Sequence, residues 1–166
     1  MNNPSAAEFA AALRLERDAV SAFVEILQRE QDALIQGADE ELDFLAATKE
    51  RMLKELAGFA ERRNHYLASR GLTQNGKGVD AWLAQGPNTA SAEQPAESTS
   101  VWNDLMRLAW TARQLNQTNG AIIATRLQRT QRALEALRRA AGTVALYGPK
   151  GQTFGIGSGR ALGAIV

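Results

Sequence analysis

The sequence predicts an all-α protein. Its expected parts are an antiparallel hairpin of two long helices, a third long helix that completes an elongated coiled-coil-like bundle, and a flexible Gly-rich C-terminal tail. Three observations lead to this prediction. Apolar residues recur at helical spacing over three long stretches, Gly interrupts the pattern where a helix should end, and aromatic residues make up only 6% of the 166 residues.

The first helix is expected over residues 5–36. Ser5 and Glu8 form a capping-box signature, in which the hydroxyl and the carboxylate satisfy each other's backbone N–H groups. Gly37 is the expected C-cap, and Asp39 is the expected N-cap of the next helix. The apolar stripe of this helix consists of Phe9, Leu13, Val20, Phe23, Leu27 and Leu34.

The second helix is expected over residues 39–70, and Gly71 marks its end. Because the connection between the two helices is so short, they must run antiparallel. The apolar stripe of this helix consists of Leu42, Leu45, Met52, Leu56, Phe59 and Tyr66.

A flexible loop is expected over residues 72–100, with one or two helical turns at 79–83 that lap onto the hairpin. The third helix is expected over 101–146, so that residues 1–146 make one domain and 147–166 a disordered tail. This helix is longer than the hairpin helices, so it either extends beyond the hairpin or bends near Asn119-Gly120. Either way, part of its apolar stripe lacks an intramolecular partner, and this predicts a binding surface. Its inward face is expected to comprise Trp102, Leu105, Ala109, Ala112, Leu115, Asn119, Ile122, Leu127, Leu134, Leu137, Ala141 and Val144.

The inventory of reactive side chains predicts no catalytic site, no metal site and no cofactor. The chain has no Cys, and His65 is its only His, expected at the surface. Neither a signal peptide nor an apolar run long enough for a bilayer is visible, which predicts a cytoplasmic protein that does not insert into membranes.

Charge is distributed unevenly along the chain. Residues 1–71 hold 9 basic and 13 acidic residues, whereas residues 72–166 hold 10 basic and 5 acidic residues. Such asymmetry can indicate a nucleic-acid surface, but the pI of 8.1 is below the range typical of nucleic-acid binders. We therefore expect an acidic hairpin beside a basic third helix, and no nucleic-acid partner.

Asn116 and Asn119 are placed at i, i+3 and are therefore expected on one face of the third helix. Two interpretations remain open. The pair forms a polar layer in the bundle core, where Asn fixes register, or it hydrogen-bonds to the backbone of a partner.

The third helix and the segment after it resemble the C-terminal block of the FlgN family, the flagellar type III export chaperones for the hook–filament junction proteins. The resemblance also covers, less specifically, the hairpin. The sequence departs from the family pattern in the 86–100 loop and in the length of the Gly-rich tail. The residues that carry it are Trp102, Leu105, Leu115, Asn116, Asn119, Gly120, Ile123, Arg126, Leu127, Gln131, Leu134, Leu137, Leu146, Tyr147, Gly148 and Gly151.

This resemblance implies a cytoplasmic chaperone that binds the C-terminal amphipathic segment of hook-associated proteins and delivers them to the flagellar export gate. Tyr147 is the candidate for docking to that gate, and the alternative is that it is an aromatic residue that closes the end of the bundle. The arginines of the helix are expected to steer acidic client segments. A structural coiled-coil adaptor with no export client, and a homodimer through the third helix, are the alternatives. The expected client-binding residues are Ile123, Leu127, Leu134, Leu137 and Val144. The steering arginines are Arg126, Arg129, Arg132, Arg138 and Arg139.

Overall fold

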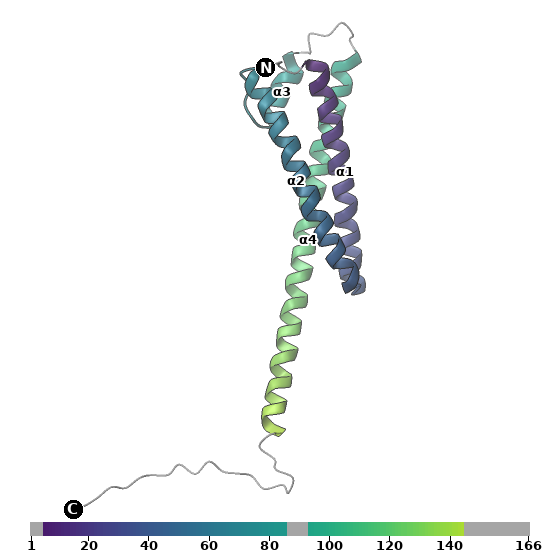
Figure 1. The fold of residues 1–166 in the computed structure, drawn as a ribbon, viewed down its shortest axis with the longest axis vertical. Coiled ribbons are helices and arrows are strands. Elements are labelled where there is room, and N and C mark those ends of the chain that lie inside the picture. The colour runs from purple at the N-terminus through teal and green to yellow at the C-terminus, as the bar shows by residue number, and fades with distance from the viewer. Residues whose placement is uncertain (1–4, 86–92, 145–166) are drawn as a thin grey trace, which may run out of the picture. The chain divides into compact units, whose positions relative to one another are not determined.

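The computed structural model of the protein describes residues 5–85 and 93–144, which form four α-helices and no strand (Figure 1). The helices are α1 (Ala6–Gln36), α2 (Asp39–Ser69), α3 (Gly76–Gln85) and α4 (Glu93–Val144). The predicted all-α class is therefore confirmed, and the tail predicted at 147–166 lies outside the described residues. The chain divides into two compact units, residues 1–123 and 124–166, so the single domain expected over 1–146 stays a prediction.

The capping box forms at the start of α1. The Ser5 backbone N–H donates to Glu8 Oε2 at 2.6 Å, and the Glu8 backbone N–H donates to Ser5 Oγ at 3.2 Å. Hydrogen bonding to Ser5 stabilises the carboxylate and lowers the pKa of Glu8. The bond to the Ser5 backbone is the larger cause, and the bond to its side chain is the smaller one.

Gly37 ends α1 in the left-handed conformation (φ 75°), as predicted. The predicted N-cap of α2 is wrong, because Ala38 occupies that position and makes no side-chain cap bond. The backbone N–H groups of Gly37 and Ala38 both donate to Ala33 O, at 2.9 and 3.0 Å, and this turn makes Asp39 the first helical residue. There its charge interacts favourably with the helix dipole instead.

The facing sides of α1 and α2 follow a heptad spacing, with steps of three and four residues. On α1, the buried positions in this series are Phe9, Leu13, Glu16, Val20, Phe23, Leu27, Glu30 and Leu34. On α2, the buried or half-buried positions are Leu45, Lys49, Met52, Leu56, Phe59, Arg63 and Tyr66. Each helix therefore carries two charged residues within an otherwise apolar stripe.

Those charged residues pair across the hairpin. Lys49 Nζ lies 2.5 Å from Glu30 Oε1, and the Arg63 guanidinium hydrogen-bonds to the Glu16 carboxylate. Only 7–8% of either carboxylate side chain is exposed. Buried charges are tolerated in a protein core when they are paired in this way.

Helix α4 contributes to both of these polar layers. The buried Asn119 Nδ2 donates to Glu30 Oε2 at 2.8 Å and to Leu27 O at 2.9 Å. At the other layer, the Arg63 guanidinium lies 5.9 Å from the centre of the Trp102 ring. Each layer thus joins residues from three helices.

Within the loop predicted over 72–100, the helical turns expected at 79–83 form as part of α3, which extends beyond them at both ends. The side chain and the backbone carbonyl of Asn75 both accept from the Gly78 N–H, at 3.2 and 3.0 Å, so Asn75 caps a helix instead of making an isolated turn. Val79 and Trp82 are buried in the core, where the Trp82 ring contacts the Phe9 ring edge-on at 4.8 Å. This burial of apolar surface stabilises a helix of only ten residues.

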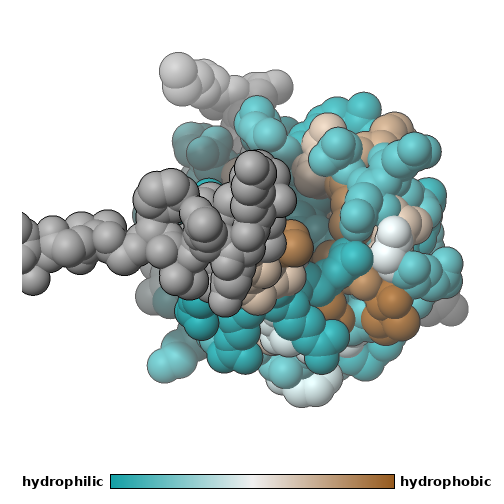
Figure 2. Space-filling model, turned by 90° about the horizontal axis from the view of Figure 1, so that it is seen from below, coloured by the Kyte–Doolittle hydropathy of each residue, from teal (hydrophilic) through white to brown (hydrophobic). Residues whose placement is uncertain are grey.

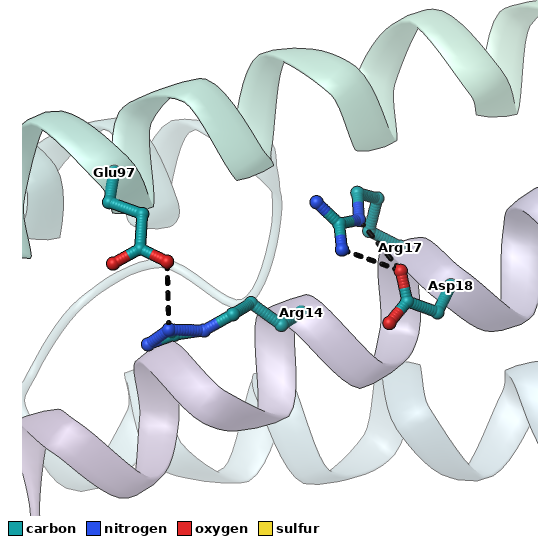
Figure 3. Close-up of polar contacts among 4 residues, drawn as sticks. All are labelled: Arg14, Arg17, Asp18 and Glu97. Atoms are coloured by element: carbon teal, nitrogen blue, oxygen red, sulfur yellow. Dashed lines mark hydrogen bonds and ion pairs between the residues drawn. The ribbon is translucent and has the colours of Figure 1, made fainter.

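The loop prediction is wrong at its C-terminal end, because α4 begins at Glu93, well before the predicted start at 101. Pro95 lies in its first turn, where a residue without an N–H group leaves no hydrogen bond unmade. Figure 3 shows Arg14 of α1 reaching Glu97 of α4, at 3.1 Å, whereas Arg17 pairs with its neighbour Asp18 at 2.6 Å. Such exposed pairs contribute little stability.

Within the first unit, α4 packs through a heptad-spaced face. Leu108 is half-buried and Ala109 is exposed, so the predicted inward position of Ala109 is wrong by one residue. The Trp102 Nε1–H donates to Asp80 Oδ1 at 2.8 Å, which links α4 to α3. The buried or half-buried residues of this face are Val101, Trp102, Leu105, Leu108, Ala112, Leu115, Asn119 and Ile122.

We expect Asn119→Ala to lower the free energy of unfolding by about 1–3 kcal/mol, because the buried Glu30 carboxylate loses a donor. Asn116→Ala is the matched control, since Asn116 is exposed on the same helix and the change in helix propensity is the same. Urea unfolding followed by circular dichroism gives both values. Equal effects of the two substitutions would contradict a stabilising role for the polar layer.

Candidate functional site: the exposed leucine row of α4

The described part of the second unit is residues 124–144 of α4, and nearly all side chains from 124 to 141 are exposed. Arg126 is half-buried, and every other residue from 124 to 141 is exposed. The exposed fractions are 57% for Leu127, 49% for Leu134 and 66% for Leu137. We call these three residues the leucine row. Figure 2 shows exposed hydrophobic residues, in brown, set among hydrophilic ones.

The leucine row follows a heptad spacing. Leu127, Leu134 and Leu137 are separated by seven and three residues, and Thr130 and Ala141 occupy the remaining positions of the same series. This is the a/d pattern by which one helix packs against another. Thr130 is already engaged locally, because its hydroxyl donates to Arg126 O at 3.1 Å.

The other predicted client-binding residues lie at the two ends of this row. Ile123 is the last residue of the first unit and is 47% exposed. Val144 is the last residue of α4. Tyr147, the predicted gate-docking residue, lies outside the described residues.

The leucine row is surrounded by positive charge. Residues 124–144 hold five arginines and one acidic residue, Glu135, which accepts from Arg139 Nη2 at 3.4 Å. The arginines are Arg126, Arg129, Arg132, Arg138 and Arg139. The surface therefore combines apolar side chains with a positive field, which attracts acidic amphipathic helices.

The two asparagines that the sequence placed on one face occupy different environments. Asn119 is 1% exposed and belongs to the polar layer with Glu30, whereas Asn116 is exposed. An i, i+3 pair spans about 60° of helix circumference, so one member can lie inside and the other at the rim. Asn119 thus holds the packed part of α4 on α1.

Apart from the leucine row, a concave surface lies between α1 and α2 and has a volume of about 670 Å³. Phe9 and Tyr66, stacked at 3.9 Å, form part of its wall, and the exposed His65 lies at its edge. Over residues 5–85 and 93–144, no group of three or more His, Cys, Asp or Glu could hold a metal ion. Within the same ranges, no helix has the length and apolar character needed to cross a membrane.

The residues that sequence patterns missed are the two buried carboxylates, Glu16 and Glu30, and their half-buried partners, Arg63 and Lys49. They fall at the gaps in the apolar stripes predicted for the two hairpin helices. Complementary gaps at equal spacing in two antiparallel helices are the signal that could have identified them, because a buried charge requires an opposite charge nearby.

These features define a class of protein. It is an all-α protein in which four helices share a core with internal polar layers, and the last helix presents a basic, leucine-lined face. The model of the FlgN family, described as FlgN protein, matches residues 1–154. The chain therefore belongs to the FlgN family, which is a family of flagellar export chaperones and not of enzymes, and whose members bind flagellar hook-associated proteins. No curated protein and no solved structure matches the chain.

We expect the double substitution Leu134→Gln with Leu137→Gln to change the free energy of unfolding by less than about 0.5 kcal/mol per site, because both side chains are exposed and Leu and Gln have similar helix propensities. Leu27→Gln, at a fully buried position, should cost at least about 3 kcal/mol. Denaturant unfolding measures both. A loss from the double substitution as large as that from Leu27→Gln would mean that the leucine row belongs to the folded core.

Proposed function

We propose that this protein is a cytoplasmic export chaperone that binds the C-terminal amphipathic segment of flagellar hook-associated junction proteins. It keeps them soluble and unpolymerised, and it delivers them to the flagellar type III export apparatus. The observation that carries this proposal is the leucine row of α4, which is exposed although it has the spacing of a helix-packing seam. Membership of the FlgN family supplies the kind of client.

The client-binding face extends the leucine row at both ends and follows the same helical series. An amphipathic client segment lays its apolar side along this face and becomes helical as it binds. The proposed client-binding residues are Ile123, Leu127, Leu134, Leu137 and Val144.

Energetics favour reversible capture over permanent assembly. Burying a fully exposed Leu is worth about 1.5–3 kcal/mol, so the half-exposed leucine row contributes on the order of 3–5 kcal/mol in total. Ordering a disordered client costs about 2–5 kcal/mol of that gain. Because these two contributions nearly cancel, the net affinity comes from the apolar residues that the client itself buries, and it stays modest. A modest affinity suits a chaperone that must release its cargo and not a structural adaptor that must keep its partner.

We expect saturable one-to-one binding of the isolated C-terminal segment of a hook-associated junction protein, with a gain of helix in the segment. Isothermal titration calorimetry and circular dichroism follow the two signals on one sample. Leu134→Gln with Leu137→Gln should abolish binding, because the apolar face loses two of its members while the net charge stays the same.

The matched control is Leu15→Gln with Leu53→Gln, which removes two leucines that are 59% and 50% exposed on α1 and α2. This control should bind the segment as the unaltered chain does. No binding by the unaltered chain, together with a tight dimer that Leu134→Gln with Leu137→Gln dissociates, would overturn the chaperone proposal in favour of a self-assembling helical adaptor.

Tyr147 is the residue that we propose for docking to the export gate, since it comes three residues after the last residue of α4, Val144, in the sequence. Tyr147→Ala should leave the affinity for the client segment unchanged and reduce export of the client in a secretion assay. An equal loss of client affinity and export would place Tyr147 in the client site instead.

A further inference from the structure

The charges that flank the leucine row occupy the positions that set partner choice in helix pairs. When Leu127 and Leu134 are heptad positions a, and Thr130 and Leu137 are positions d, Arg126 falls at g and Arg138 at e. Side chains at e and g lie beside the seam and determine which helix can pair with it.

All charge at these flanking positions is positive. The remaining e and g positions between 124 and 140 hold uncharged residues, namely Ala124, Gln131, Ala133 and Ala140. The single acidic residue, Glu135, falls at position b, away from the seam, and pairs with Arg139. A partner helix that packs on the leucine row therefore meets positive charges at the flanking positions and no acidic side chain.

Pairing with a second copy is disfavoured by this arrangement. Two copies would bring ten arginines and two glutamates into one short helix pair, with no acidic side chain at e or g to oppose Arg126 and Arg138. Like charges across a helix pair are destabilising, and proteins use them to exclude wrong partners. Thr130 and Ala141 also leave the seam weaker than a row of leucines would be.

We propose that the leucine row is a heterotypic seam that selects a partner helix with apolar residues at a and d and acidic residues at e and g, and that the same arginines prevent the chain from pairing with itself. The occupant is an acidic amphipathic helix. This inference rests on the proposed function, because it specifies the chemistry of the client segment that the chaperone accepts.

The test uses the full chain and two synthetic helical peptides that share the same leucines at a and d. One peptide carries Glu at e and g, and the other carries Lys. The Glu peptide should bind at least about tenfold more tightly, since each attractive pair replaces a repulsive one. Its affinity should fall as salt rises from low to physiological concentration.

Arg126→Glu with Arg138→Glu should reverse this preference, and Arg138→Glu alone should reduce it. The matched control is Arg107→Glu with Arg113→Glu, which makes the same change in net charge at two exposed positions of α4 in the first unit. The control should keep the preference for the Glu peptide. Circular dichroism verifies that every variant retains its helix content.

Equal binding of the two peptides, or an unchanged preference after charge reversal, would overturn the inference. So would a dimer of the unaltered chain that Leu134→Gln with Leu137→Gln dissociates. The two proposals fail separately. A junction-protein segment that binds through the leucine row without charge dependence supports the chaperone function and removes only the selection by charge. Binding of the Glu peptide without binding of that segment supports the selection by charge and contradicts the chaperone function.

Discussion

Two partly buried ion pairs at equal spacing determine the register in which α1 and α2 pair. Glu16 and Glu30 are 14 residues apart on α1, and their partners Arg63 and Lys49 are 14 residues apart on α2. A slip of one heptad in either direction would place one of the two carboxylates opposite Leu56. An unpaired buried charge costs about 3–5 kcal/mol, so the slipped arrangements are excluded although their apolar residues would still match.

The third helix uses the same two layers. Asn119 reaches the Glu30 layer and Trp102 lies against the Arg63 layer, so α4 is held in register at two heights. Buried polar groups of this kind add little net stability compared with apolar replacements, but they can specify one arrangement among several similar ones. The first unit thus obtains its stability from two apolar clusters and its alignment from the two polar layers, of which the Glu16 layer lies between the clusters and the Glu30 layer beyond the second.

Much of this fold follows from the sequence, because the hairpin has strong periodicity, a capping box and a Gly stop. What escaped prediction depended on tertiary contacts. The helical turns at 79–83 were predicted, but the full length of α3 was not, because a helix of ten residues is stabilised by the burial of Val79 and Trp82. The early start of α4 was hidden by a polar, Pro-containing segment, although Pro is acceptable in a first turn.

The candidate site was located from the sequence only in part. An excess of apolar stripe over available partners indicates that a surface exists, and Leu127, Leu134 and Leu137 are indeed exposed. Which of Asn116 and Asn119 faces the core could not be decided from spacing, because a rotation of the helix by a fraction of a turn exchanges their roles. That rotation is set by Leu27 and Glu30, more than 80 residues earlier in the chain.

The division between the core positions and the leucine row has a consequence for how this protein can evolve. Substitutions that alter ligand preference commonly reduce stability when the two properties depend on the same side chains. Here the buried residues of the described chain all lie at or before Asn119, and the leucine row begins at Leu127. Mutations that alter the proposed recognition can therefore accumulate in the last helical turns at little cost to folding. The same separation would let protein engineers exchange those turns without redesigning the core.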